Sequence, residues 1–300
     1  MDFCKFFICT FEILICRSDR RARRQRRQRW YELLNILFWN LGKNAIEEYI
    51  VDCIIEKSID IAVFSEFEGI DFEKIVMNLG GFYNYVCWEG QQDRKVTLVA
   101  KTTFCVELIQ QQDRYNIYNI KTAVKDYLLA AVHLQDRRNF NIADRLETIR
   151  YLVADIEKNE DLLKCDNTIV IGDFNANPYD EELLSKYAFN AVLFKMLIDK
   201  NEFTNPRSFK RKRFYNPILH YISENTEMYG SFYYDRESTT SYWHCLDQVL
   251  VRKDLADNIV HVEYLKRIGK RELLKNTIPN RQISDHLPLI VNLQEVENEN

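Results

Sequence analysis

Acidic, amide and imidazole side chains stand at or near the ends of six apolar runs of this 300-residue chain. These residues are Asn40, Glu66, His133, Asp173, Asn175, Asp247, Asp285 and His286. Each one alone has an ordinary structural explanation, because a strand-end Asn or Asp often caps a turn and a lone His among apolar residues usually belongs to the core. Their repeated position needs another explanation, since α/β sheets gather their functional sites at strand ends.

The set combines carboxylates, carboxamides and imidazoles, and it contains no nucleophilic Ser or Cys. Oxygen-rich clusters with one to three carboxylates suit Mg²⁺, a hard cation that keeps several waters and binds substrate phosphate. Imidazole and amide groups can stabilise the negative charge that grows on phosphoryl oxygens. The residue types therefore predict metal-assisted hydrolysis of a phosphate ester, with Mg²⁺, or Mn²⁺ in its place, as the cofactor.

The stretch IVIGDFNANP, residues 169–178, shows how one strand supplies several of these groups. Its first three apolar residues predict a buried strand, and Gly172 is expected to let the backbone turn tightly. Side chains alternate along an extended chain, so Asp173 and Asn175 are expected on one face with Phe174 packed on the other.

Hydrophobic periodicity predicts the elements that position these groups. Strands are expected at 33–39, 60–66, 82–88, 95–100, 104–109, 115–121, 127–134, 167–173, 246–251, 258–264 and 287–293, and helices at 44–57, 72–79, 141–158 and 180–200. Helices between strands, together with consecutive hairpins, indicate a mixed sheet or two sheets covered by helices. Residues 203–244, rich in Phe, Tyr, Asn and basic residues, are expected to form a long functional loop or insertion.

One domain is expected over residues 33–294, because no internal repeat or low-complexity linker interrupts this pattern. Residues 1–32 are expected to be an extension outside the domain and residues 295–300 a short tail. The apolar segment 1–16 is too short to span a membrane, and it differs from a signal peptide because the positive charges follow it. We therefore expect no membrane span.

Charge and cysteine usage add two expectations. Residues 1–16 carry −1 and residues 17–29 carry +7, so that residues 30–300 carry −10 of the total of −4. An arginine-rich tract of this kind is usually a solvated tail that can contact nucleic acid or an anionic membrane. Eight scattered cysteines without a C-x-x-C pair indicate reduced thiols in a cytoplasmic protein, rather than a zinc site or a disulfide framework.

Six motifs follow one another along about residues 33–293: Trp39-Asn40, Ser65-Glu66, Val132-His133-Leu134, Gly172-Asp173-Phe174-Asn175, Leu246-Asp247 and Ser284-Asp285-His286-Leu287-Pro288. Their types and order resemble the endonuclease/exonuclease/phosphatase superfamily of Mg²⁺-dependent phosphoesterases. The resemblance implies an α/β fold, a four-layer α-β-β-α sandwich with two facing mixed sheets. It also implies a metal-binding hydrolase that acts on ester bonds of phosphate.

The resemblance implies a role for each matched position. Glu66 corresponds to the principal Mg²⁺ ligand, and Asn40 and Asp285 complete the environment of the metal. Asp173 corresponds to the residue that orients or deprotonates the attacking water. Asn175 matches the amide that holds the phosphate and its developing negative charge.

Both histidines are implied to contact the phosphate. Asp247 would accept a hydrogen bond from the other ring nitrogen of His286, and such a carboxylate raises the pKa of an imidazole. For His133 the acidic partner is not evident, and Asp93 and Glu89 are weak candidates. The abasic-site DNA repair branch generally has Tyr at the His133 position, so the resemblance favours the deoxyribonuclease, sphingomyelinase and phosphoinositide-phosphatase branches.

The basic loop RSFKRKRFY, residues 207–215, is expected to bind substrate. Lys210, Arg211, Lys212 and Arg213 suit phosphates, and the neighbouring aromatic rings suit stacking on bases. The alternative is a solvated loop whose rings dock on the body, and the charge of −10 argues against tight general DNA binding. The stretches FYNPILHYI, GSFYY and WHCLDQVLV resemble a group of bacterial members of the superfamily.

Three functions remain open. The first is a nuclease or phosphodiesterase acting on DNA or RNA, with water activated by Asp173 and phosphate held by Asn175, His133 and His286. The second is a phosphomonoesterase of a small-molecule, inositol or lipid phosphate. The third is a non-catalytic binding module, the least favoured because no motif position is lost. No stable protein partner is implied.

Overall fold

The computed structural model describes residues 32–86, 95–204, 211–224, 230–236 and 242–295. The helices within these stretches are α1 (Glu47–Glu56), α2 (Phe72–Asn78), α3 (Ile142–Leu163), α4 (Glu181–Leu184), α5 (Lys195–Lys200), α6 (Ile218–Glu224) and α7 (Lys253–Ala256). The amphipathic pattern predicts α1, α2 and α3 correctly, because each buries apolar side chains on one face. α3 extends beyond its predicted end to Leu163.

The helix predicted over residues 180–200 is not continuous. Two short helices, α4 and α5, flank the strand β9 (Ala191–Val192). Phe189 packs edge-on against Phe174 with ring centroids 5.3 Å apart, and Asn190 has a left-handed φ of 53°. The prediction is wrong because the burial of Phe189 draws this segment against the sheet and outweighs its helical periodicity.

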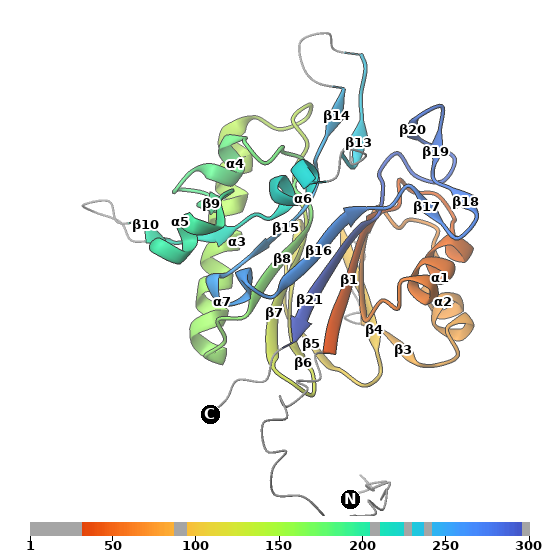
Figure 1. Ribbon diagram of the computed structural model, residues 1–300, viewed down its shortest axis with the longest axis horizontal. Helices are drawn as coiled ribbons and strands as arrows, with labels where there is room; N and C mark the ends of the chain where they lie inside the picture. Colours follow the sequence, from red (N-terminus) through yellow and green to blue (C-terminus); the bar gives the residue numbers. More distant parts are fainter. Residues whose placement is uncertain (1–31, 87–94, 205–210, 225–229, 237–241, 296–300) are drawn as a thin grey trace, which may run out of the picture. The chain divides into compact units, whose positions relative to one another are not determined.

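Six strands form a mixed sheet in the order β16-β21-β1-β2-β4-β3 (Figure 1). In that order they cover Ile259–Tyr264, Leu289–Glu295, Glu32–Asn40, Ile61–Ser65, Val96–Lys101 and Tyr83–Val86. β1 and β2 are parallel, so that Asn40 and Ser65 pair at the carboxyl ends of both strands. The other neighbours in this sheet are antiparallel.

Seven strands form a second mixed sheet in the order β5-β6-β7-β8-β15-β12-β9. The first six cover Cys105–Gln111, Tyr115–Lys121, Asp126–His133, Thr168–Asp173, Asp247–Val251 and Phe214–Tyr215. β7 pairs parallel to β8, and β8 pairs antiparallel to β15. The region 203–244, predicted as one long loop, thus contributes β12 to a large sheet, and it also contains α6.

Short two-stranded ribbons complete the described part of the chain. They are β10 (Phe203–Thr204) with β11 (Arg211–Lys212), β13 (Phe232–Tyr233) with β14 (Trp243–His244), β17 (Arg267–Ile268) with β18 (Arg271–Glu272), and β19 (Leu274–Lys275) with β20 (Ile278–Pro279). The β13–β14 ribbon matters for function, because Phe232 forms an isolated bridge with His286.

The two large sheets share one apolar core. Phe38 of β1 and Val63 of β2 belong to the same buried cluster as Leu129 of β7 and Ile171 of β8. On its other face the seven-stranded sheet packs against α3, and α1 and α2 lie beside the six-stranded sheet (Figure 1). This α/β arrangement, with two facing mixed sheets and helices outside them, confirms the four-layer sandwich.

Two further observations concern the cysteines and the length and hydropathy of the helices. The described cysteines, Cys53, Cys105, Cys165 and Cys245, carry free thiols, as their spacing predicts. No described helix is both long and apolar enough to cross a bilayer.

Candidate active site

The register of the seven-stranded sheet places three predicted site residues side by side. His133, at the end of β7, pairs with Asp173, at the end of the parallel strand β8. Asp247, the first residue of β15, pairs with Asp173 from the other side. Backbone pairing alone therefore sets one carboxylate between an imidazole and a second carboxylate.

Gly172 lets β7 and β8 approach one another just before Asp173. A Cβ at Gly172 would overlap the carbonyl oxygen of Val132, and its φ is 154°. The tight turn predicted at this glycine is therefore replaced by a different requirement, close contact between two parallel strands. Phe174 is buried in the core beside α3. Asp173 points away from the Phe174 ring, as the alternation predicts, into the polar cluster that it forms with His133, Asp247 and their polar neighbours.

His286 and Asp247 form a buried pair. The Nδ1 atom of His286 lies 2.7 Å from Asp247 Oδ2, and both side chains are almost fully buried. Burial alone would lower the pKa of His286, but the charge and hydrogen bond of Asp247, together with Asp173 and Asp285, raise it to about 10. Burial raises the pKa of the Asp247 carboxyl, and the charge of His286 opposes that rise. The pair therefore favours the protonated form of His286, whose Nε2 faces Asp173.

Both imidazoles converge on one oxygen. His286 Nε2 lies 3.9 Å from Asp173 Oδ2, and His133 Nε2 lies 3.8 Å from the same atom. His133 Nε2 also lies 3.5 Å from Glu66 Oε1. The acidic neighbours of His133 in the described chain are therefore Asp173 and Glu66, and its Nδ1 is buried with no hydrogen bond to a described residue. Asp93 and Glu89 lie outside the described residues.

Asn40 connects the two sheets at the site. Its Nδ2 lies 3.1 Å from Asp173 Oδ2 and 3.4 Å from Glu66 Oε1, while its Oδ1 accepts a hydrogen bond from the backbone N–H of Gly42. Glu66, directly after β2, has a φ of 47°. A left-handed backbone at a residue other than glycine is strained, and such strain concentrates at functional sites, where it orients a side chain.

Asp285 lies close to Gly42. A Cβ added to Gly42, whose φ is 57°, would lie 3.1 Å from Asp285 Oδ1. Glu66 and Asp285 both line one cavity of about 290 Å³. The Asp285 carboxylate forms no hydrogen bond or ion pair with a described residue, and within the described chain the partners of the Glu66 carboxylate are His133 and the Asn40 amide. Carboxylates left in this way suit a hard divalent cation, so the residues fit the metal that the family resemblance implies.

A second group of donor atoms has spacing that would suit a metal. One oxygen each of Asp173 and Asp247 and one nitrogen of His286 lie within 4.8 Å of one another. However, Nδ1 of His286 is already bonded to Asp247, and a protonated imidazole has no free lone pair for a metal. This group is therefore suited to hydrogen bonding and proton transfer.

Asn175 stands at the rim of the cluster. Its backbone N–H donates to Asp173 Oδ1 at 2.8 Å, and its Nδ2 donates to the carbonyl oxygen of Leu134 at 2.9 Å. One amide hydrogen remains for a substrate oxygen. The buried Arg145 of α3 donates to the carbonyl oxygen of Asn175 at 2.7 Å and forms a 2.6 Å ion pair with the buried Glu182. Arg145 thus fixes the left-handed backbone of Asn175, whose φ is 48°.

Four residues that sequence reasoning missed hold His286 in place. Trp39 Nε1 donates to the His286 carbonyl oxygen at 3.1 Å, and Ser284 Oγ accepts from the His286 N–H at 3.0 Å. Ser231 Oγ accepts from the N–H of Asp247 at 3.1 Å, and the Phe232 ring lies 4.8 Å from the imidazole. Trp39 and Ser284 stand inside the quoted motifs, which was an available signal for both.

The basic residues predicted to bind substrate lie elsewhere. Lys212 pairs with Asp166, two residues before β8, and Arg213 donates to the carbonyl oxygens of Leu197 and Asn201. The start of β8 is about 17 Å along the strand from Asp173. Arg211 is buried, with Nη1 3.6 Å from Glu157 of α3, and Lys210 lies outside the described residues. The structure does not bring Arg211, Lys212 or Arg213 to the polar cluster.

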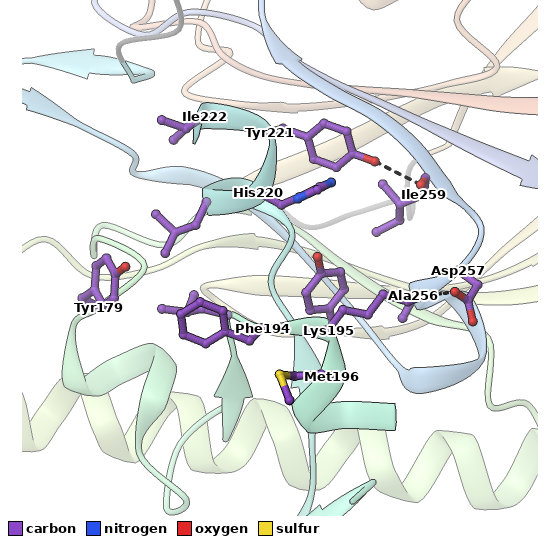
Figure 2. Close-up of a pocket in the computed structure, with 13 residues that line it drawn as sticks. Tyr179, Phe194, Lys195, Met196, His220, Tyr221, Ile222, Ala256, Asp257 and Ile259 are labelled. Atoms are coloured by element: carbon purple, nitrogen blue, oxygen red, sulfur yellow. Dashed lines mark hydrogen bonds and ion pairs between the residues drawn. The ribbon is translucent and has the colours of Figure 1, made fainter. Parts of the chain in front are cut away.

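Another cavity, of about 700 Å³, lies beside α5, α6 and α7, and none of the predicted site residues lines it (Figure 2). Two pairs of its polar groups bind one another. Lys195 forms an ion pair with Asp257, and the Tyr221 hydroxyl donates to the carbonyl oxygen of Ile259 at 3.0 Å. The aromatic rings and methylene groups between these pairs make it an apolar groove, separate from the polar cluster.

Solved structures share this fold. Truncated TDP2 of Caenorhabditis elegans is 11% identical with a TM-score of 0.58, over 87% of this chain and 97% of that chain. D. rerio TDP2 complexed with a single-strand DNA product is 13% identical with a TM-score of 0.54, over 87% and 98%. An AP endonuclease from Archaeoglobus fulgidus is 17% identical with a TM-score of 0.53, over 86% and 98%. At such identities these likenesses establish the fold alone.

No curated protein matches the chain by sequence. The model of the Endonuclease/Exonuclease/phosphatase family matches residues 33–286, a span that begins in β1 and ends at His286. The predicted catalytic and metal-binding residues, from Asn40 to His286, all fall within this span. The chain therefore belongs to the endonuclease/exonuclease/phosphatase family and has the fold of its phosphoesterases and nucleases.

Proposed function

We propose that this protein hydrolyses phosphodiesters in a Mg²⁺-dependent reaction, with a nucleic acid strand as substrate. The observation that carries the proposal is the convergence of two imidazole Nε2 atoms on Asp173 Oδ2, at 3.8 and 3.9 Å. The two imidazole N–H groups can donate to a phosphate oxygen, and the Asp173 carboxylate can accept from a water molecule placed beside that phosphate. That is the constellation a hydrolytic attack on phosphorus requires.

Glu66 and Asp285 would hold the divalent cation, with the amide oxygen of Asn40 close by. When bound, the cation would polarise a phosphoryl oxygen and neutralise charge that develops in the transition state. Asn40 has a second role through its nitrogen, because its bond to Asp173 Oδ2 keeps that carboxylate pointed at the reaction centre.

Asp173 would accept the proton of the attacking water. Its Oδ1 is held by the N–H of Asn175, which leaves Oδ2 as the oxygen that meets the imidazoles. As the water oxygen forms its bond to phosphorus, the bond from phosphorus to the leaving oxygen breaks. His286 and His133 would donate Nε2 hydrogens to the phosphoryl oxygens, on which negative charge increases.

Asp247 acts on the substrate through His286. Its bond to Nδ1 fixes which ring nitrogen faces the phosphate, and its charge keeps the imidazole protonated. A fixed cation at this place stabilises a phosphorane-like transition state without reorganisation.

A nucleic acid substrate is supported by two of the structural neighbours. One was solved with a single-strand DNA product, and another is an AP endonuclease. Phosphomonoesters remain the second class to test, because a cation with two imidazoles would also hold a terminal phosphate.

The test incubates the protein and Mg²⁺ with single- and double-stranded DNA, with RNA, and with nucleotide and inositol phosphates. Strand scission without release of inorganic phosphate is expected. Release of phosphate from monoesters alone would select the phosphatase instead. Asp173→Asn is expected to abolish scission, and the matched control Asp161→Asn, on the exposed side of α3, is expected to retain it. Full activity of Asp173→Asn would overturn the assigned chemistry.

A further inference from the structure

The cavity of about 290 Å³ beside Glu66 and Asp285 also receives three arginine side chains. Arg138 follows β7, Arg236 follows β13, and Arg281 precedes the segment that carries His286. These residues come from three separate parts of the chain, and all three are exposed to solvent. None of them has a role in the chemistry proposed above.

None of the three guanidinium groups forms an ion pair with a described carboxylate, and Asp136 acts on the Arg138 guanidinium only through its charge. Among the described residues no carboxylate lies within ion-pair distance of Arg138, Arg236 or Arg281, although Glu66 and Asp285 line the same cavity. The cavity is thus lined by arginines and by carboxylates that do not form ion pairs with one another. A bound metal ion would compensate the two carboxylates, but it would leave the three arginines in need of an anion.

A series of aromatic contacts links Arg138 to His286. The Phe232 ring lies 4.8 Å from the ring of His286 and 6.4 Å from that of Tyr234, to which it is nearly parallel at 15°. The Arg138 guanidinium lies over the Tyr234 ring at 5.0 Å. Successive contacts of this kind limit the motion of Arg138, because the ring face attracts the cation. The arginine is therefore presented at a fixed place on the surface that continues from His286.

We propose that this cavity binds a second phosphate of the substrate, next to the phosphate that is hydrolysed. The inference rests on the proposed function, because it takes the phosphodiester site at Asp173 as given. A planar guanidinium binds two oxygens of one phosphate at once, and three such groups can surround the anion. The protein therefore prefers substrates with two neighbouring phosphates to substrates with one. An internal phosphate of a strand and a phosphate at a strand end share this chemistry.

Chromogenic nucleotides test the preference directly. Thymidine 5′-(p-nitrophenyl phosphate) is compared with the same compound carrying a 3′-phosphate, and thymidine 3′-(p-nitrophenyl phosphate) with its 5′-phosphorylated form. In at least one pair the second phosphate is expected to raise kcat/KM at least about tenfold, since hydrogen bonds to charged groups are the strong ones. No preference in either pair would overturn the inference. Replacing that terminal phosphate with a diester to a second nucleoside separates an internal phosphate from an end phosphate.

Arginine variants then assign the preference to this cavity. Arg138→Gln combined with Arg281→Gln is expected to lower the ratio of the two kcat/KM values about tenfold or more, and Arg281→Lys to lose less than Arg281→Gln. Arg150→Gln, an exposed arginine on α3, is the matched control and should leave the ratio unchanged. An unaltered ratio in the double variant, with an unchanged melting temperature, would show that the cavity does not bind the phosphate.

A binding measurement separates the two proposals. Calorimetric titration of the protein with thymidine 3′,5′-bisphosphate should give a Kd at least about tenfold below that of the matching thymidine monophosphate, and the Arg138→Gln, Arg281→Gln variant should lose the difference. Tighter binding of the bisphosphate without hydrolysis of any diester would contradict the hydrolytic function and support the cavity as a phosphate site. Hydrolysis without any preference for a second phosphate would support the hydrolytic function and contradict this inference.

Discussion

The Nδ2 atom of Asn40 lies 3.1 Å from Oδ2 of Asp173, and this contact joins the ends of β1 and β8. The two strands belong to different sheets, so one hydrogen bond fixes the distance between the sheet ends where the site lies. Asp173 Oδ1 is held by the N–H of Asn175. Both oxygens of the carboxylate are thus positioned before any substrate arrives.

Asn40→Asp should replace this contact with a repulsion. The new carboxylate would lie beside Asp173 and Glu66, so we expect kcat to fall about 100-fold and the free energy of unfolding to fall by about 1–3 kcal/mol. Steady-state kinetics and urea unfolding measure the two effects. Asn276→Asp, in an exposed turn, is the control and should alter neither. Normal turnover in Asn40→Asp would show that the bond between the sheets is dispensable.

Gly172→Ala should destabilise the fold more than an ordinary glycine replacement. Its Cβ would overlap the Val132 carbonyl oxygen, so β7 and β8 would have to separate. We expect a loss of about 3 kcal/mol or more, measured by thermal unfolding. Gly81→Ala is the matched control, because Gly81 has a φ of 74° but no atom within 4 Å of the added Cβ. It should cost about 1 kcal/mol. Equal losses in both variants would refute the close-approach argument.

Asp247 and His286 should act as one unit. Asp247→Asn removes the charge that holds His286 protonated, and His286→Asn removes the donor itself. Each variant should lower kcat by about 10²–10⁴, and the double variant should lose little more than either one. A double-mutant cycle on kcat measures this coupling. Additive losses would mean that Asp247 does not work through the imidazole.

Arg145 should be needed both for stability and for the position of Asn175. Arg145→Met removes the 2.6 Å partner of the buried Glu182 carboxylate and leaves it only the half-exposed Arg137 at 3.3 Å, so we expect a loss of about 3 kcal/mol in unfolding free energy. Combining it with Glu182→Leu removes this poorly compensated buried charge and should restore most of the stability. The Asn175 carbonyl would still lack its donor, so kcat should stay at least about tenfold low. Recovery of kcat together with stability would show that Arg145 only supports the fold.

Glu66→Gln should weaken the response to Mg²⁺. Removing one of the two carboxylates that would hold the cation should raise the Mg²⁺ concentration for half-maximal activity about tenfold or more. Glu68→Gln is the control, because that exposed carboxylate two residues away pairs with Lys43 at 3.3 Å. A chelator should abolish activity, and added Mg²⁺ should restore it. An unchanged Mg²⁺ response in Glu66→Gln would remove Glu66 from the metal site.

The sequence predicts the members of the polar cluster because each one stands at or near an end of an apolar run, and strand ends are readable from a single chain. It cannot show that β15 pairs with β8 rather than with another strand. Strand order depends on contacts between distant residues, and no local pattern records them. The approach of Asp247 to Asp173 is therefore visible only in the fold.

The cationic residues around the site illustrate a related limit. Basic residues gather visibly at 210–213, yet Lys212 pairs with Asp166 before the start of β8, and Arg213 donates to the carbonyl oxygens of Leu197 and Asn201 at α5. The arginines beside Glu66 come from three loops far apart in the sequence, and exposed arginines are common on every protein surface. Their shared cavity becomes apparent only after the loops are folded.

The pairing of β1 with β21 has a consequence for synthesis on the ribosome. Asn40 and His286 stand near opposite ends of the described chain, and Ser284 Oγ donates to the Asn40 carbonyl oxygen at 2.7 Å. A nascent polypeptide that still lacks residues 284–286 has neither this hydrogen bond nor the imidazole. Assembly of the site therefore waits until both β1 and the segment that carries His286 have been synthesised and brought together.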